Sequence, residues 1–278
     1  MSASSPSIPL AAENFLYIRE LLAREAAIII EKGKEYLVEN RLDTVACRRG
    51  FTGANALIGK LRATASPFLT PLHHEAIDAL TTNETLFFRD ISPFDALRDH
   101  VIPAFREKNP GKPFTLWSAA SSTGQEAYSV AITFAENFPG LPLTLLGTDL
   151  SPTMVERARA GLYQENEVGR GLSPEMLARY FRKQGESWQL ADEIRRRAEF
   201  KVLNLAKPWP ALPRFHVVML RNVMIYFDLE TRRRILNQVK QVLEPGGYLV
   251  LGGAETTLNL DASFEPVAVG RTTFYRAP

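Results

Sequence analysis

The sequence predicts an α/β protein: a mostly parallel sheet with helices on both faces and antiparallel last strands, preceded by an all-helical domain and interrupted by a small antiparallel β insertion. Three observations support this fold class. Apolar strand-like runs alternate with helical patterns from Phe114 onward, helical spacing dominates residues 13–80, and a charged stretch at about 182–198 lengthens one crossover. Strands that are separated by helices favour parallel pairing, because each crossover returns the chain to the same edge of the sheet.

The composition bounds the class of protein. The 278 residues are 45% apolar and 23% charged, which is typical of a soluble globular protein. A net charge of +2 gives no strong attraction to nucleic acid or to an anionic membrane surface. No segment reaches the roughly 18 uninterrupted apolar residues that span a bilayer. We therefore expect no nucleic-acid partner and no membrane insertion.

The cysteine and histidine pattern argues against a metal site. Cys47 is the single cysteine, which excludes an internal disulfide and a cysteine-based zinc site and favours a reducing, cytoplasmic compartment. His73 and His74 are adjacent, so they lack the i, i+4 spacing of a helical metal pair. They are expected to be surface or packing residues.

The N-terminal part is expected to be a lead-in followed by helices. Residues 1–12 are rich in Ser, Pro and Ala and lack the basic start and apolar centre of a signal peptide, so we expect a disordered lead-in. Apolar residues then recur at helical spacing over Phe15–Leu22, Tyr36–Val45 and Ala54–Leu61. This pattern predicts a helical domain over 13–80.

Three basic residues recur along the second of these helices. Lys34, Arg41 and Arg48 are seven residues apart, so they would lie near one helix face over roughly 21 Å. Such a stripe can bind an acidic partner. It can also be an ordinary solvated face, because acidic residues interleave with it: Glu31, Glu35, Glu39 and Asp43.

The start of the predicted sheet indicates a nucleotide-type ligand. The apolar run Phe114–Trp117 breaks into small residues and Gly124, after which apolar residues resume at helical spacing through Phe134. Small residues allow the backbone to approach a ligand, and the helix start offers unpaired N–H groups. The loop has neither G-x-G-x-x-G nor a Gly-Lys-Ser/Thr ending, so it is not a common phosphate cradle. An adenosine-type cofactor with little phosphate, such as S-adenosylmethionine, is expected.

The second strand ends in an acid. Leu143–Asp149 reads as a buried strand, and in adenosine-binding folds an acid at this position accepts hydrogen bonds from ribose hydroxyls. The alternative is that Asp149 caps the next helix, but Ser151 followed by Pro152 can serve as the cap instead. The ligand role is therefore favoured.

The remaining pattern completes the sheet. Polar residues at the predicted carboxyl ends of the strands are expected to gather at one edge, where ligands of such sheets bind. These residues are Ser118, Asp149, Asn204 and Arg221. The other predicted elements are helices at 152–160, 174–181 and 229–243, strands at 199–204, 216–220 and 248–252 with a turn at 245–247, and a terminal hairpin at 264–269 and 272–276.

A segment before the sheet combines capping and aromatic residues. Thr81 and Glu84 have the spacing of a capping box, which predicts a helix start. Burial of Phe87 and Phe88 would then hold Arg89 at the edge of the apolar surroundings. There its guanidinium could bind a carboxylate through two parallel hydrogen bonds. An ordinary capped helix with a surface arginine is the alternative.

Five segments together point to one family: TTNETLFFRD (81–90), LWSAASSTGQEAYS (116–129), GTDLS (147–151), RNVMIYFD (221–228) and LEPGGYLVLGGAE (243–255). They resemble the CheR-type methyltransferases, which use S-adenosylmethionine to methylate glutamate side chains on chemotaxis receptors. The resemblance implies a Rossmann-like class I methyltransferase domain over 81–278. It also implies a cytoplasmic, monomeric enzyme recruited to membrane receptor arrays. Some family members dock a receptor's C-terminal pentapeptide on the insertion, which looks a few residues shorter here, so that contact stays open.

The resemblance also implies roles for individual residues. Tyr226 would lie beside the methyl group, and Arg89 and Arg221 would serve catalysis. The basic helix with Lys34, Arg41 and Arg48 would engage the receptor's helical bundle. The residues expected around the cofactor are Asn83, Thr85, Arg89, Ala119, Glu126, Asp149, Asn204, Leu205, Leu220 and Arg221.

The implied chemistry needs alignment and no general base. A glutamate side chain with a pKa near 4.3 is already ionised at neutral pH. Arg89 or Arg221 would orient carboxylates while Tyr226 shapes the methyl pocket. Two alternatives are a methyltransferase of RNA or of a small molecule and a cofactor-sensing module without turnover. A nicotinamide-dependent dehydrogenase is disfavoured, because the loop lacks the glycine spacing that a pyrophosphate requires.

Overall fold

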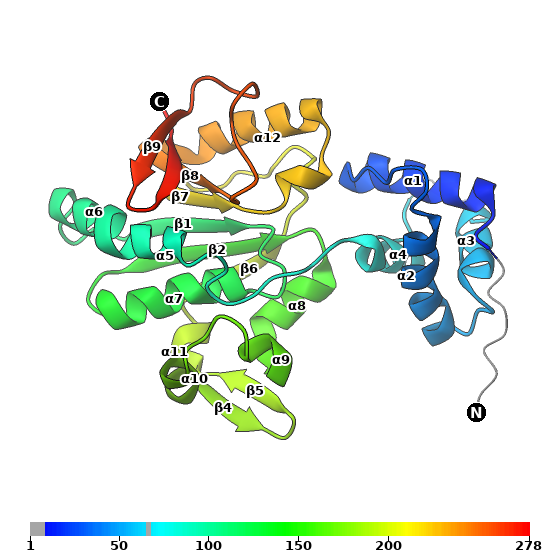
Figure 1. Ribbon diagram of the computed structural model, residues 1–278, viewed down its shortest axis with the longest axis horizontal. Coiled ribbons are helices and arrows are strands. Elements are labelled where there is room, and N and C mark those ends of the chain that lie inside the picture. The colour runs from blue at the N-terminus through cyan, green and yellow to red at the C-terminus, as the bar shows by residue number, and fades with distance from the viewer. Residues whose placement is uncertain (1–8, 65–67) are drawn as a thin grey trace. The chain divides into compact units, whose positions relative to one another are not determined.

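The structure is a computed structural model that describes residues 9–64 and 68–278 (Figure 1). The chain forms two compact units, Met1–Thr82 and Asn83–Pro278. Most of the expected lead-in, residues 1–8, lies outside the described residues.

The N-terminal unit is built from helices, as the apolar spacing predicts. Helix α2 packs against both α3 and α4, and side chains such as Val38 and Leu42 are fully buried between them. His73 is buried in α4, where its ring and the Thr70 side chain complete a reciprocal N-terminal cap. The two histidines were expected to be surface or packing residues, and the structure shows His73 packed and His74 exposed. The helices are α1 (Ala12–Ala26), α2 (Glu35–Arg48), α3 (Ala54–Arg62) and α4 (Pro71–Leu80).

The second unit contains a seven-stranded sheet in the order β6-β2-β1-β7-β8-β10-β9. The first five strands in this order are parallel, and β10 and β9 are antiparallel. The predicted fold class is confirmed. The strands are β1 (Phe114–Ala119), β2 (Leu143–Asp149), β6 (Ala198–Val202), β7 (Phe215–Leu220), β8 (Leu243–Leu251), β9 (Glu265–Val269) and β10 (Thr272–Arg276).

The strand register aligns the carboxyl ends. Ala119, the last residue of β1, lies opposite Thr148 on one side and Leu220 on the other. The chain order runs outward in both directions from β1, and ligands of such sheets bind at the carboxyl ends of the strands where the order reverses. The residues that follow β1, β2, β6 and β7 therefore share one edge.

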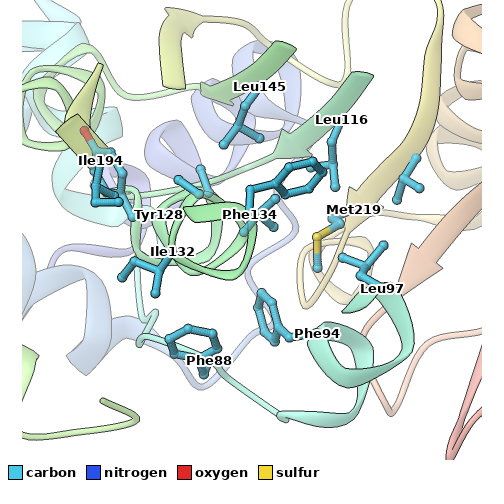
Figure 2. Packing of buried hydrophobic residues seen from close by; sticks show 14 of the residues in the cluster. Phe88, Phe94, Leu97, Leu116, Tyr128, Ile132, Phe134, Leu145, Ile194 and Met219 are labelled. Carbon is cyan, nitrogen blue, oxygen red and sulfur yellow. The ribbon is translucent and has the colours of Figure 1, made fainter. Parts of the chain in front are cut away.

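Helices cover both faces of the sheet. Figure 2 shows Leu116, Leu145 and Met219, from three neighbouring strands, packed around Phe134 of α7. The opposite face of β1 carries Trp117, whose indole meets Trp209 edge-on at 4.9 Å. On the α7 face lie α5 (Ser92–Ala96), the π-helical turn η1 (Leu97–Val101), α6 (Ile102–Lys108), α7 (Gln125–Asn137) and α8 (Pro152–Ala160), while α12 (Leu229–Val242) packs against β8.

The insertion is larger than predicted. The sequence indicated about 182–198, whereas its three-stranded sheet, in the order β3-β5-β4, already begins at Leu162. Strand β3 has three residues, which is too short to show a period, and it forms through pairing with β5. The insertion comprises β3 (Leu162–Gln164), α9 (Glu165–Val168), α10 (Pro174–Tyr180), β4 (Phe181–Gln184), β5 (Ser187–Leu190) and α11 (Asp192–Arg195).

Strand β8 also begins earlier than predicted. The Pro245–Gly247 stretch was expected to be a turn before the strand, but it lies inside β8. Its pairing with β7 shifts register between Phe215 and Val217, and this irregularity absorbs the extra residues.

The insertion anchors the segment before the sheet. The Phe87 ring lies edge-on to Tyr163 at 5.1 Å and to Phe181 at 5.4 Å. Gly171, with φ of 87°, passes so close to this segment that a Cβ there would overlap the Phe87 carbonyl oxygen. Backbone and side chain of Phe87 are thus both fixed by the insertion.

Replacing Gly171 by Ala is expected to destabilise the second unit by several kcal/mol. About 1–2 kcal/mol comes from a left-handed alanine, and the rest from displacing the Phe87 backbone. Urea unfolding of the full chain measures the effect. Gly185→Ala is the matched control, because Gly185 has φ of 62° and nothing within 4 Å of its Cβ position. Equal losses in the two variants would contradict the close packing at Gly171.

Candidate active site

The loop after β1 wraps around the Asp149 carboxylate. Ala120 and Ser122 have positive φ angles of 55° and 48°, so the loop turns sharply before α7. This turn lets the Ser122 backbone N–H donate to Asp149 Oδ2 at 2.8 Å, while the Ser151 N–H donates to Oδ1 at 3.0 Å. The predicted acid is buried at the end of β2 and held by two backbone donors.

Helix α8 is capped by Ser151, as predicted. The Ser151 hydroxyl accepts from the Met154 N–H at 3.2 Å, and Pro152 occupies the first turn. Asp149 is therefore not the cap of this helix.

Glu126 lies in the first turn of α7, where a negative charge is favoured by the helix dipole. The Ser118 hydroxyl donates to Glu126 Oε1 at 2.8 Å, and Arg221 Nη1 donates to Oε2 at 2.9 Å. The carboxylate is thus fixed between the ends of β1 and β7, next to the loop that holds Asp149.

Arg221 joins three separate segments. Besides Glu126, its guanidinium contacts Asp90 Oδ2 at 2.9 Å and the Arg89 carbonyl at 2.7 Å through Nη2. The Arg221 side chain is only 2% exposed and lies over the Phe94 ring at 5.8 Å. Its two terminal nitrogens are therefore engaged by the protein itself.

The segment before α5 is not a helix start, so the capping-box prediction at Thr81 is wrong. Thr81 ends α4 with an extended backbone, and its hydroxyl donates to the Asp78 carbonyl at 2.7 Å. Phe88 and Asp90 have φ angles of 49° and 53°, which no helix accepts. The next helix, α5, begins only at Ser92.

This irregular segment runs beside the loop that follows β1. The Ser122 hydroxyl donates to the Asn83 carbonyl at 2.8 Å, and the Phe88 N–H donates to the Ser129 hydroxyl at 2.8 Å. Phe88 is buried, as expected, and Thr85 and Arg89 are half-buried. The anchoring brings the residues of this segment to the same edge of the sheet as Asp149.

Arg89 differs from Arg221 in how much of it is engaged. Arg89 Nη1 donates to the Glu84 carbonyl at 3.1 Å. Among residues 9–64 and 68–278, neither its Nη2 nor its Nε has a hydrogen-bond partner, so this half-buried cation keeps donors available. Of the two arginines predicted to orient carboxylates, Arg89 is the accessible one.

Asn204 and Leu205 follow β6 at this edge. Asn204 Oδ1 accepts from the Ala206 N–H at 2.9 Å, which forms a tight turn. Leu205 is buried, and its carbonyl accepts from Trp209 Nε1 at 3.2 Å. Leu220 and Ala119 end neighbouring strands and are buried beside each other.

Tyr226 follows β7 on the 3₁₀ turn η2 (Met224–Tyr226). The side chain is half-buried, and within the described parts of the chain its hydroxyl makes no hydrogen bond. Sequence reasoning missed the residues that hold this region. They are Asp90, Ser122 and Glu255, and all three lie inside the five segments that carry the family resemblance.

The three basic residues predicted for a partner differ in their engagement. Arg41 donates to the carbonyls of Leu80 and Thr81, each at 2.8 Å, so it closes the end of α4. Lys34 is exposed at the N-cap of α2, and Arg48 is an exposed residue that pairs with Glu75 at 3.3 Å. The stripe is therefore not uniform.

Among the described residues, no group of three or more His, Cys, Asp or Glu side chains could hold a metal ion. None of the helices in this described part combines the length and apolar character that crossing a bilayer needs.

Residues 83–272 match the family described as "CheR methyltransferase, SAM binding domain". The chain belongs to the CheR methyltransferase family. A Pseudomonas aeruginosa relative named chemotaxis protein methyltransferase 1 is 38% identical over 271 residues, covering 95% of this chain and 97% of that protein. A Pseudomonas putida relative, chemotaxis protein methyltransferase Cher2, is 36% identical and covers 95% and 98%. A Vibrio parahaemolyticus chemotaxis protein methyltransferase is 35% identical and covers 97% and 98%.

The cofactor is S-adenosylmethionine, because the matched family is the S-adenosylmethionine-binding domain of CheR methyltransferases. The donor set at the carboxyl edge of the sheet fits this group. Asp149 and Glu126 are carboxylates held by backbone or side-chain donors, and such groups suit ribose hydroxyls and a cationic amine. Buried Ala119, Leu205 and Leu220 offer apolar surface beside them.

Replacing Asp149 by Asn is expected to weaken S-adenosylmethionine binding by roughly tenfold or more, because a hydrogen bond to a charged group contributes about 1.5–3 kcal/mol. Isothermal titration calorimetry measures the affinity. Asp192→Asn, an exposed change in the insertion, is the control. Unchanged affinity in the Asp149 variant would contradict a cofactor contact.

Replacing Arg41 by Ala is expected to lower the free energy of unfolding of the N-terminal unit by about 1.5–3 kcal/mol, since two helix-end carbonyls lose a charged donor. Arg48→Ala, which removes only an exposed ion pair, should cost about 0–1 kcal/mol. Urea unfolding followed by circular dichroism compares the two. A smaller loss for Arg41 than for Arg48 would contradict its role at the end of α4.

Proposed function

We propose that this protein transfers a methyl group from S-adenosylmethionine to glutamate side chains in the cytoplasmic signalling domain of a chemoreceptor. The products would be glutamyl methyl esters that serve sensory adaptation. The observation that carries the proposal is the position of Arg89. Its backbone is tied through Arg221 to Glu126, and its guanidinium keeps donors available for a carboxylate.

The cofactor contacts in this proposal follow the edge of the sheet. Glu126 would hold the amino group and Asp149 the ribose, while Asn204 and Leu205 would border the adenine. The support is that these residues lie on the loops after β1, β2 and β6, which share one edge. The remaining proposed contacts are Asn83, Thr85, Arg89, Ala119, Leu220 and Arg221.

The chemistry asks little acid–base work of the protein. When bound, S-adenosylmethionine supplies a methyl group on a cationic sulfur. A substrate glutamate is already a carboxylate at neutral pH, so no base has to remove a proton. The residues of the chain would align this carboxylate and exclude water around it.

The two arginines would then have different tasks. Arg89 would bind a carboxylate, either that of the incoming glutamate or that of the cofactor's methionine part. Arg221 would hold Glu126 and the Arg89 segment in place, since its own terminal nitrogens are engaged. Tyr226 would shape the pocket beside the transferred methyl group.

The proposed partner is a helical receptor domain. Lys34 and Arg48 are exposed cations on and next to α2, which suits an acidic helical bundle. Arg41 would contribute mainly by holding α4. Because the substrate is the cytoplasmic part of a receptor, the reaction would take place in the cytoplasm at membrane receptor arrays.

Replacing Arg89 by Ala is expected to reduce methyl transfer to receptor signalling domains by roughly 100-fold or more, because misalignment of reacting groups is that costly. The measurement uses labelled S-adenosylmethionine and scores base-labile methyl esters. Cofactor affinity assigns the role. A raised KM for the receptor with unchanged cofactor Kd indicates the glutamate, and a weakened Kd indicates the cofactor carboxylate.

Arg98→Ala is the matched control, because Arg98 is a partly exposed arginine paired with Asp95 and Asp99, and none of these residues is a proposed contact of cofactor or substrate. It should leave transfer unchanged. Near-normal turnover by the Arg89 variant, or label found on RNA or small molecules instead of receptor glutamates, would overturn the proposed function.

A further inference from the structure

We propose that Glu255 is a positioning residue of the methyl-transfer site, one that fixes the turn carrying Tyr226. This inference rests on the proposed function, because it assigns Glu255 to the same site. Glu255 follows β8, where its own N–H donates to the Gly252 carbonyl at 2.9 Å and folds the chain into a turn. The half-buried side chain then reaches back to the loop after the neighbouring strand β7.

The Glu255 carboxylate collects three backbone N–H groups. Oε2 accepts from Asn222 at 2.7 Å and from Gly252 at 2.8 Å, and Oε1 accepts from Met224 at 2.8 Å. These donors lie just past the ends of β7 and β8, in irregular backbone that the sheet does not pair. One charged side chain therefore satisfies donors from both loops.

The surroundings leave little room for another arrangement. Asn222 has a φ of 56°, a left-handed conformation that aims its N–H toward Glu255. A Cβ on Gly252 would come within 2.6 Å of Asn222 Nδ2 and 2.8 Å of Glu255 Oε2. The contact thus depends on a glycine at position 252 and on a left-handed backbone at Asn222. Backbone strain of this kind occurs at functional sites, where the surrounding structure holds the residue in one conformation.

The held loop carries the proposed reaction residues. It begins at Arg221 and ends in the η2 turn, where the Tyr226 N–H donates to the Val223 carbonyl at 3.2 Å. On the far side Asp228 caps α12 by accepting from the Thr231 N–H at 2.7 Å, and this hydrogen bond lowers the pKa of the Asp228 carboxyl. Glu255 fixes one side of the turn and α12 the other.

In the described part of the chain the Glu255 carboxylate bonds backbone N–H groups and makes no hydrogen bond to Tyr226, so it acts on Tyr226 through the backbone. A glutamine at 255 would turn one accepting oxygen into an NH2 donor facing a backbone donor. The turn would then shift while the sheet and the cofactor loop stay in place. This separates a positioning effect on transfer from an effect on cofactor binding.

The test uses Glu255→Gln in the full chain, with Glu230→Gln as control because Glu230 is an exposed first-turn acid of α12 paired with Arg233. Hydrogen exchange should accelerate at the amides of Asn222, Met224 and Gly252. We expect kcat for receptor methylation to fall roughly 10- to 100-fold, with the S-adenosylmethionine Kd within about threefold. In a Tyr226→Phe background, Glu255→Gln should lower kcat by a much smaller factor than it does in the wild type.

Each outcome is decisive. The inference is overturned if Glu255→Gln keeps the wild-type kcat although its amide hydrogens exchange faster. It is also overturned if the variant only melts at a lower temperature while kcat per folded molecule is unchanged. Full additivity with Tyr226→Phe also overturns it. If Glu255→Gln fails to fold, Glu255→Asp replaces it, because aspartate keeps the charge but is one methylene shorter. The same result is expected of it: a fall in kcat without a comparable change in the S-adenosylmethionine Kd. A wild-type protein that methylates no receptor glutamate refutes the proposed function, whereas the exchange rates still report the contact itself.

Discussion

The candidate site depends on one buried cation. A guanidinium taken out of water needs opposite charges and hydrogen-bond acceptors around it, or its desolvation destabilises the fold. Arg221 meets this need with Glu126, Asp90 and the Arg89 carbonyl, which come from two segments far from it in the sequence. Satisfying one charge therefore forces the start of α7 and the segment before α5 to meet at the end of β7.

This constraint explains why an irregular segment can serve a site that needs fixed geometry. Residues 83–90 have no helix or strand to hold them. They are instead held at successive points by Ser122, Ser129, Arg221 and the aromatic pocket of the insertion around Phe87. The insertion thus supports the edge of the sheet from its side, and Arg89 projects from a backbone that is fixed on both sides.

The sequence predicts regular elements well and loops poorly, for a physical reason. Continuous apolar runs and helical spacing are periodic, so the strands around Leu116 and the cap at Ser151 could be located. The segment at Thr81 has the letters of a capping box, but positive φ at Phe88 and contacts with distant residues decide its conformation. Glu255 gives no local signal, because its three donors exist only after β7 and β8 pair.

The arginines show the same limit in electrostatic terms. Spacing placed Lys34, Arg41 and Arg48 on one face, and motif position gave Arg89 and Arg221 similar roles. The arginines differ in how many of their guanidinium N–H groups are already hydrogen-bonded within the protein. Arg41 and Arg221 donate to carbonyls or carboxylates of the chain, whereas Arg89 keeps donors available. A buried cation that left its protein partners to bind a substrate would leave those partners unpaired and destabilise the fold. Such a cation is therefore suited to holding the segments of a site in place and poorly suited to binding a ligand. Removing it should disturb several segments at once, whereas removing an available cation should disturb only the ligand.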